Sequence, residues 1–269
     1  MTSRPTALRA PELLAFADKV RSGMALSSPD DPYEFADFFH GWISGSKLND
    51  LGGLSTFPVR ETCIGVTHHI DALIMAHGEH GIQILEHDYA YYRRLWPHKE
   101  WALIGGLLPG KPLLIACPFP GYGKVHPAWN DILGECEAKD IDIHLDCAWL
   151  SAARNISIDL GHPRIASLAI SLSKGMCLDW NRIAVRYSRL ADPTDPITIA
   201  NAHDMINSMD MAVGMAYMQE FGPDHLWTKW GNAYESYCRS NRLRPTDCIH
   251  MALELGTNKP VGTQDLLTL

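Results

Sequence analysis

The stretch Ser171–Tyr187, SLSKGMCLDWNRIAVRY, places Lys174 three residues after a serine and eight residues before Arg182. The run Asp146-Cys147-Ala148-Trp149 precedes it. A lysine amine can form a Schiff base with an aldehyde, and a carboxylate can pair with a protonated ring nitrogen. Serine and arginine bind phosphate, the arginine through two parallel N–H donors. Each residue alone is most simply a surface or turn residue. Together they predict a site for a cofactor that carries an aldehyde, a ring nitrogen and a phosphate.

The stretch resembles the lysine motif of the fold type I, aspartate-aminotransferase-like family of pyridoxal-phosphate enzymes. The family's Asp-x-Ala-Tyr motif is similar to the run that begins at Asp146, which ends a predicted strand. The resemblance implies that Lys174 forms the Schiff base with pyridoxal 5'-phosphate and that Asp146 pairs with the pyridine nitrogen. Ser171 and Arg182 fall on phosphate-binding positions.

Two positions depart from the family pattern. Trp149 stands where the family has a tyrosine that hydrogen-bonds the cofactor's phenolic oxygen; an indole N–H can donate but cannot ionise. Phe119, within the turn Cys117–Gly123, stands where an asparagine donor is expected. These departures predict altered protonation of the bound cofactor and do not exclude its binding.

Two upstream segments extend the resemblance. Gly65-Val66-Thr67 opens a helical pattern, and a small-residue turn of this kind presents free N–H groups to a phosphate, which makes Val66 and Thr67 candidate cofactor ligands. By itself, such a turn is an ordinary helix start. Tyr89 falls where the family has an aromatic ring stacked on the cofactor, with Tyr91 as the alternative and His87 in place of a proline.

Short apolar strands and helices alternate from Gly65 onward, which predicts an α/β fold: a three-layer sandwich with a mostly parallel sheet. The resemblance implies a fold type I large domain. We expect an N-terminal helical or irregular segment (1–60), a cofactor-binding α/β domain (61–195) and a C-terminal helical segment (196–269) packed on it. Strands are expected near 82–86, 101–105, 112–117, 141–146, 165–171 and 183–188, and helices near 10–22, 67–77, 89–95 and 126–138.

The C-terminal part is short for the family. Only 95 residues follow Lys174, and the last twelve contain no arginine. The resemblance therefore implies that the small C-terminal domain is reduced or absent, and the arginine that clamps the substrate carboxylate cannot be assigned.

Composition limits the function classes. A net charge of −8 argues against a nucleic-acid binder, and no apolar run is long enough for a membrane span. Seven cysteines without Cys-x-x-Cys spacing predict free thiols, and no signal peptide is visible, so a cytoplasmic location is expected.

Two patterns suggest other sites but are not interpreted as such. The thirteen histidines show no metal-ligand spacing, so no metal is expected. His144 is interpreted as a satisfied core histidine, with orientation of Asp146 as the alternative. Gly105–Lys111 has the glycine and lysine spacing of a phosphate-binding P-loop. However, Pro112 stands where a P-loop has serine or threonine, and the segment leads into a strand instead of a helix.

The resemblance implies an enzyme that acts on an amino acid or another amine. Lys174 would hold the cofactor as a Schiff base, release it to the substrate amine, and then act as general base and acid at the α-carbon. An aminotransferase is expected first. A lyase, decarboxylase or oxidase would use the same residues, and a non-catalytic partner protein or an unrelated α/β enzyme also remains open. Family members are usually homodimers, so a homodimer is expected.

Overall fold

The computed structural model describes residues 4–78, 81–92 and 102–268. Its centre is a six-stranded sheet with the strand order β1-β6-β5-β4-β3-β2. Strands β2 to β5 pair in parallel, and β6 is antiparallel to both of its neighbours, β5 and β1. The strands span β1 (Val59–Cys63), β2 (Gln83–Ile84), β3 (Leu113–Ala116), β4 (Ile143–Cys147), β5 (Ile165–Ser171) and β6 (Ala184–Ser188).

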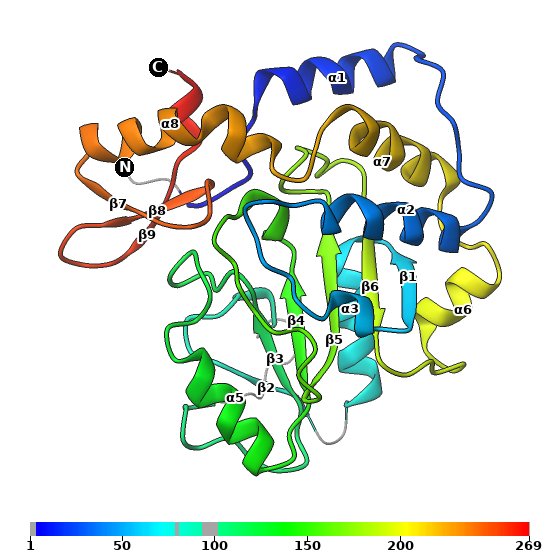
Figure 1. The fold of residues 1–269 in the computed structure, drawn as a ribbon, viewed down its shortest axis with the longest axis vertical. Helices are drawn as coiled ribbons and strands as arrows, with labels where there is room; N and C mark the ends of the chain where they lie inside the picture. The colour runs from blue at the N-terminus through cyan, green and yellow to red at the C-terminus, as the bar shows by residue number, and fades with distance from the viewer. Residues whose placement is uncertain (1–3, 79–80, 93–101, 269) are drawn as a thin grey trace.

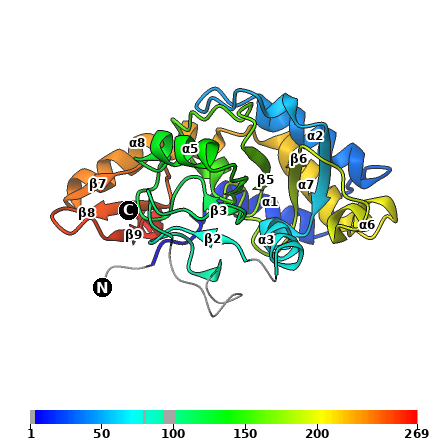
Figure 2. The ribbon, with the colours of Figure 1, turned by 90° about the horizontal axis from the view of Figure 1, so that it is seen from below.

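Helices cover both faces of this sheet. Helix α3 (Gly65–Ala76) lies on one face, and α2 (Pro32–Ser44) and α5 (Trp129–Ala138) lie on the other (Figures 1 and 2). Side chains of α1 (Pro11–Arg21) and α7 (Ser208–Glu220) join the core on the α2 and α5 side. Helix α6 (Pro196–Ala202) lies beside β1. The expected three-layer sandwich is therefore confirmed.

Alternation along the central strands assigns each side chain to a face. In β4, Ile143, Leu145 and Cys147 belong to the larger core on the α2 and α5 side. Side chains in a strand point alternately to opposite faces, so His144 and Asp146 face α3. The same alternation places Ser171, the last residue of β5, on the α3 face. Polar groups of neighbouring parallel strands thus meet at the carboxyl end of the sheet, beside the start of α3.

Five of the six expected strands are present, and β5 has the expected bounds. The sixth, expected at 101–105, is wrong as a strand: only Ala102 pairs, through an isolated parallel bridge to Leu85, and a turn follows. Position 101 lies outside the described residues, as do the last three positions of the helix expected at 89–95.

Strand β1 was not expected from the sequence, because Arg60 and Glu61 interrupt its apolar pattern. In the structure the Glu61 side chain is buried and forms an ion pair with Arg186 of β6, which also pairs with Asp195 at 2.7 Å. A buried charge is tolerated when a partner compensates it. The partner lies more than 120 residues away, so local periodicity could not indicate this strand.

The C-terminal segment is only partly the helical segment that was expected. Helix α8 (His225–Ser240) is followed by a small antiparallel sheet of order β7-β8-β9, and the two stand together at one end of the molecule (Figure 1). These strands, β7 (Leu243–Pro245), β8 (Met251–Glu254) and β9 (Pro260–Gly262), are too short for a period-two pattern. The buried Tyr234 hydroxyl of α8 connects them by accepting the Thr246 N–H at 2.7 Å and donating to the Met251 carbonyl at 2.8 Å.

The seven cysteines are all buried and unpaired, as expected. Within the described ranges, no helix combines the length and the apolar character needed to cross a membrane.

Candidate active site

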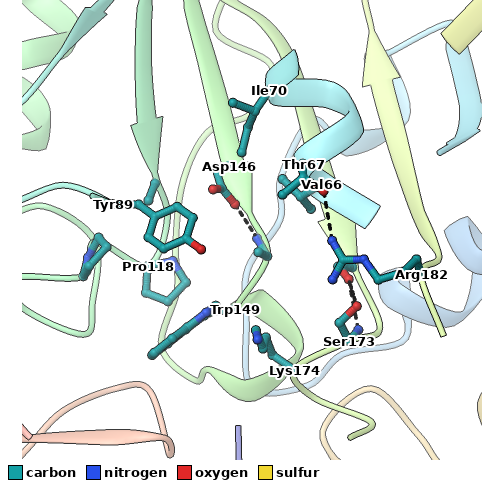
Figure 3. Close-up of a pocket in the computed structure, with 14 residues that line it drawn as sticks. Val66, Thr67, Ile70, Tyr89, Pro118, Asp146, Trp149, Ser173, Lys174 and Arg182 are labelled. Carbon is teal, nitrogen blue, oxygen red and sulfur yellow. Dashed lines mark hydrogen bonds between the residues drawn. The ribbon is translucent and has the colours of Figure 1, made fainter. Parts of the chain in front are cut away.

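A cavity of about 160 Å³ lies at the carboxyl end of the central sheet, against the start of α3 (Figure 3). All eight site residues predicted from the sequence line it: Val66, Thr67, Tyr89, Asp146, Trp149, Ser171, Lys174 and Arg182. They come from four separate segments of the chain. Had Thr67 and Tyr89 lain far from Lys174, a coincidental resemblance would have gained support, but the structure brings them together.

One wall of the cavity can bind an anion. The Arg182 guanidinium donates to the Thr67 hydroxyl at 2.9 Å in the first turn of α3. No side chain caps the N-terminus of this helix, so its first N–H groups and positive dipole end are available. Gly65 has a positive φ of 70°, and a Cβ there would lie 2.6 Å from Arg182 Nη2. A glycine is therefore required for the arginine to lie against the helix.

Two serines complete this wall. The Ser171 hydroxyl donates to the Ser173 hydroxyl at 2.9 Å and accepts the Ser173 backbone N–H at 3.0 Å. Both serines are buried and line the cavity. The next turn packs closely, because a Cβ at Gly175 would lie 2.3 Å from the Ser151 hydroxyl oxygen. The motif residues thus fold into a tight turn that places Ser173 and Lys174 side by side at the cavity.

Asp146 lies at the opposite wall and is 5% exposed. Its Oδ2 accepts the Tyr92 hydroxyl at 2.7 Å, and its Oδ1 accepts the Ala148 N–H at 2.9 Å. Burial raises the pKa of Asp146 above its ordinary value, whereas the two hydrogen bonds and the positive charge of Lys174 act to lower it. A carboxylate in this position can accept one more donor from the cavity.

Lys174 is half-buried at the cavity wall. Among the described residues its amine has no hydrogen-bond or ion-pair partner; Asp179, the acid whose charge acts on it most, is instead held by Arg9 at 2.8 and 2.9 Å. Burial lowers the pKa of Lys174, and the charges of Arg182 and Arg9 lower it further. A lysine with a depressed pKa offers more of the neutral amine that attacks a carbonyl carbon.

The backbone of Lys174 is held by His250, which is fully buried. His250 Nδ1 accepts the Leu8 N–H at 3.1 Å, so the ring proton lies on Nε2, which donates to the Lys174 carbonyl oxygen at 3.1 Å. Burial lowers the pKa of His250 to about 3. This neutral ring joins the N-terminal segment and the C-terminal segment to the lysine turn.

Tyr89 forms the aromatic wall. Its ring lies edge-on to Tyr92 at 5.5 Å and is stacked on Tyr91 at 5.9 Å. Tyr91 itself does not line the cavity; its hydroxyl lies 3.4 Å from Asp71 of α3. Of the two tyrosines considered from the sequence, Tyr89 is therefore the one placed to contact a bound ring.

The two departures from the family pattern occupy the remaining wall. Trp149 lines the cavity and contacts His250 edge-on at 5.6 Å. Phe119 is fully buried and turned away, between Tyr122 and His126 at 5.6 and 4.7 Å, while Pro118 and Pro120 on either side line the cavity. This wall is therefore largely apolar.

His144 does not contact Asp146. Its Nδ1 lies 2.7 Å from the Ser167 hydroxyl, and burial lowers its pKa to about 3. The interpretation as a satisfied core histidine is confirmed, and the alternative role in orienting Asp146 is wrong. The reason is register: Ser167 lies beside His144 in the parallel pair of β4 and β5.

A second, more open chamber of about 610 Å³ adjoins the cavity and shares Tyr89, Pro120 and Trp149 with it. Arg4 and Lys259 line this chamber, and neither has an ion-pair partner in the part of the chain that the structure describes. Lys259 comes from the turn between β8 and β9.

Sequence reasoning missed three residues of the site. Ser173 had a usable signal, since it adjoins the lysine in the same motif. Tyr92 and His250 had none, because each acts through a hydrogen bond to a residue 54 or 76 positions away.

The residues present fit pyridoxal phosphate. An unpaired lysine amine, a buried carboxylate and a cluster of arginine, hydroxyl and helix N-terminal donors line one cavity, and the space beside Arg182 requires a glycine. Those are the groups that an aldehyde, a pyridine nitrogen and a phosphate require.

No family model matches the chain, and no curated protein matches its sequence. Solved structures do match the fold. Tyrosine aminotransferase from Leishmania infantum is 14% identical with a TM-score of 0.61, over 91% of this chain and 78% of that one. Histidinol-phosphate aminotransferase from Sinorhizobium meliloti, in complex with pyridoxal-5'-phosphate, is 14% identical with a TM-score of 0.60, over 99% and 88%.

L-threonine-O-3-phosphate decarboxylase from Porphyromonas gingivalis is similar to the same extent, with 14% identity and a TM-score of 0.61 over 93% of this chain and 80% of that one. At such identities the likeness concerns the fold and leaves the reaction open. The chain has the fold type I, aspartate-aminotransferase-like fold of pyridoxal-phosphate-dependent enzymes.

Proposed function

We propose that the chain is a pyridoxal-phosphate-dependent enzyme that acts on an amino acid or another amine through Lys174, with transamination as its reaction. The observation that carries the proposal is the meeting of Lys174, Asp146 and Arg182 at one cavity. Lys174 would react with the aldehyde, Asp146 would bind the ring nitrogen and Arg182 would bind the phosphate. Structural neighbours with this fold include aminotransferases.

The residues divide the binding task. Arg182, Thr67 and the first N–H groups of α3 would hold the phosphate, together with the two serine hydroxyls. Asp146 would accept the ring N–H, and Tyr89 would cover one face of the ring. When bound, pyridoxal phosphate supplies an electron sink for the carbon next to the substrate nitrogen.

Lys174 then moves the proton. Its amine would accept the proton of the substrate α-carbon and return it at another position. The depressed pKa of Lys174 favours its unprotonated form, which is the form that can act as a base. The apolar side chains of Trp149, Pro118 and Pro120 would limit the access of water to the site.

Arg4 and Lys259 place positive charge in the chamber that adjoins the cavity. We assign the substrate carboxylate to this chamber, because Arg4 and Lys259 line it and neither side chain has an ion-pair partner among the described residues. A small amino acid would place its amine toward Lys174 and its carboxylate toward the chamber.

The visible absorbance of the protein with added pyridoxal phosphate tests the proposal. The band that the cofactor acquires on reaction with a lysine should be present in the wild type and in Lys124→Ala, a surface control, and absent in Lys174→Ala. Equilibrium dialysis of the same three proteins gives the cofactor dissociation constants. Absence of the band from the wild type would reject catalysis and leave a non-catalytic partner protein.

The reaction is tested by supplying single amino acids together with a 2-oxo acid. Appearance of a new amino acid supports transamination. Release of carbon dioxide or ammonia without amino transfer supports a decarboxylase or a lyase, reactions that would use the same residues.

We further propose a homodimer of this chain, in the cytoplasm. Light scattering tests the oligomeric state, and a strict monomer with full activity would reject the dimer.

A further inference from the structure

The segment from Asp88 to Tyr92 crosses the carboxyl ends of β3 and β4 and is tied to both by buried side chains. Asp88 Oδ2 accepts the N–H of Ala116, the last residue of β3, at 3.2 Å, and its Oδ1 accepts the Tyr89 N–H at 2.6 Å. The Tyr92 hydroxyl donates to Asp146 of β4 at 2.7 Å. Asp88 is 6% exposed and Tyr92 is 2% exposed.

The bond from Tyr92 determines how Asp146 faces the cavity. With Oδ2 held by the phenol and Oδ1 held by the Ala148 N–H, the carboxylate plane is fixed from two sides. Each oxygen keeps a further lone pair, so a third donor can approach from the open side. A hydrogen bond to the charged form of a carboxyl group also favours that form over the protonated one.

Tyr92 also supports the aromatic wall. Its ring meets the Tyr89 ring edge-on, at 5.5 Å with an interplanar angle of 89°. The Asp88 carboxyl group accepts the backbone N–H of Tyr89. Tyr89 is therefore held at its ring by Tyr92 and at its backbone by Asp88, although its own side chain is partly exposed at the cavity.

We propose that Tyr92 and Asp88 are positioning residues of this site: Tyr92 orients Asp146 and maintains its charged form for the ring nitrogen, and Asp88 holds Tyr89 against the face of the bound ring. This inference rests on the proposed function. It assigns roles to two buried residues on either side of the aromatic wall.

The charges around the pair agree with this arrangement. Burial raises the pKa of Asp88 to about 8, and the nearby Asp146 contributes to the rise. A raised pKa of Asp88 reduces the negative charge that this side chain places beside Asp146. The other titratable groups that act on Asp146 or Asp88 are Tyr92, Lys174, Cys117 and Cys147.

The first test uses the protein without cofactor, so its readout does not depend on activity. Aspartate labelled with carbon-13 at the side-chain carboxyl gives the titration midpoint of Asp146, whose resonance is identified by its loss in Asp146→Asn. Tyr92→Phe should raise this midpoint by roughly one to two pH units, since it removes a hydrogen bond to a charged group. Tyr91→Phe is the matched control and should leave the midpoint unchanged.

The second test measures the pyridoxal-phosphate dissociation constant. Tyr92→Phe and Asp88→Asn should each weaken binding by about 10-fold, whereas Tyr91→Phe should not. In Asp88→Asn, the amide oxygen can still accept one of the two N–H groups that Asp88 binds, and the other N–H loses its acceptor. This variant also tests the inference if Tyr92→Phe does not fold.

The outcomes separate the two hypotheses. If Tyr92→Phe leaves both the Asp146 midpoint and the dissociation constant at wild-type values, the role of Tyr92 is rejected; an unchanged dissociation constant in Asp88→Asn rejects the role of Asp88. If the wild type does not bind pyridoxal phosphate but the midpoint rises in Tyr92→Phe, the proposed function fails and the link from Tyr92 to Asp146 stands.

Discussion

The Asp146 wall and the Trp149 wall of the cavity are built from different kinds of groups. At the Asp146 wall, two buried carboxyl groups and a phenol are linked by hydrogen bonds to the ends of β3 and β4. At the Trp149 wall, two prolines and an indole face the cavity, and Phe119 points into the core. The phenolic oxygen of a bound cofactor would meet one donor at most, while its ring nitrogen would meet a supported carboxylate.

This difference follows from where each wall originates. Asp146 itself stands on a parallel strand, whose register with β3 and β5 fixes the place of this residue, and Asp88 and Tyr92 are hydrogen-bonded to the ends of β3 and β4. The Trp149 wall stands on turns, which tolerate replacement of a donor by an apolar side chain. Under the proposed function, Asp146 on the first wall would govern the electron sink, and the apolar side chains of the second wall would change how the bound cofactor is tuned.

The largest expected effect concerns the Asp146 wall. Asp146→Asn removes the charge that holds a proton on the ring nitrogen, so the turnover number should fall by about 10²-fold or more. Steady-state kinetics on the best amino substrate measures it, with Asp71→Asn on α3 as the control. If the turnover number of Asp146→Asn equalled that of Asp71→Asn, Asp146 would have no role in the reaction, and the two walls would not differ in function.

Arg182→Gln should affect binding more than chemistry, because the arginine lies on the phosphate side and belongs to neither wall. Loss of a hydrogen bond between charged groups costs about 1.5–3 kcal/mol, which weakens cofactor binding roughly 10- to 100-fold. Titration with pyridoxal phosphate measures this, and competition by inorganic phosphate should weaken in parallel. Arg164→Gln, whose side chain pairs with Asp140 on the surface, serves as the control.

Acid stability examines one buried histidine on each side of the comparison, His144 in the same strand as Asp146 and His250 beside Trp149. His144 and His250 have native pKa values lowered to about 3 by burial, below the value of about 6.5 in an unfolded chain. As the pH falls below 6.5, the unfolded chain binds protons that the native chain does not, so the stability present at neutral pH is progressively lost.

Each of these histidines should lower the free energy of unfolding by about 1.4 kcal/mol per pH unit between pH 6 and 4. Urea titrations across this range measure the slope, and it should be shallower in His144→Gln than in the wild type. Equal slopes would mean that His144 is protonated in the native protein.

The smallest effect concerns the Trp149 wall. Trp149→Tyr should restore a hydroxyl donor to the phenolic oxygen and lower the pH at which the spectrum of the bound cofactor changes, by less than about one unit. Trp149→Phe removes the indole donor and should move the change in the opposite direction. Two variants with the same spectrum at every pH would show that no donor acts from this wall.

Much of the site could be predicted because its residues lie in two short motifs at strand ends. Lys174, Ser171 and Arg182 belong to one segment, and Asp146 and Trp149 to another, so spacing along the chain carried the information. The central strands were also predictable, because β3 is a continuous apolar run and the apolar residues of β4 and β5 recur at short spacing.

The elements that were missed depend on distant partners. Strand β1 requires the ion pair of Glu61 with Arg186, and the short strands β7 to β9 require each other and the Tyr234 hydroxyl. Glu61 and Arg186 are 125 positions apart, so no local window contains both, and β7 to β9 are too short to show a period-two pattern.

The sequence by itself determined the fold class and indicated Lys174 and Asp146 as the proposed reactive lysine and its carboxylate, because hydrophobic periodicity and motif spacing are local properties. Only the tertiary structure decided that Tyr92 donates to Asp146, that His250 holds the Lys174 backbone and that Phe119 turns away from the cavity. Those contacts join segments that are adjacent only once the strands have paired, and their geometry depends on register and packing.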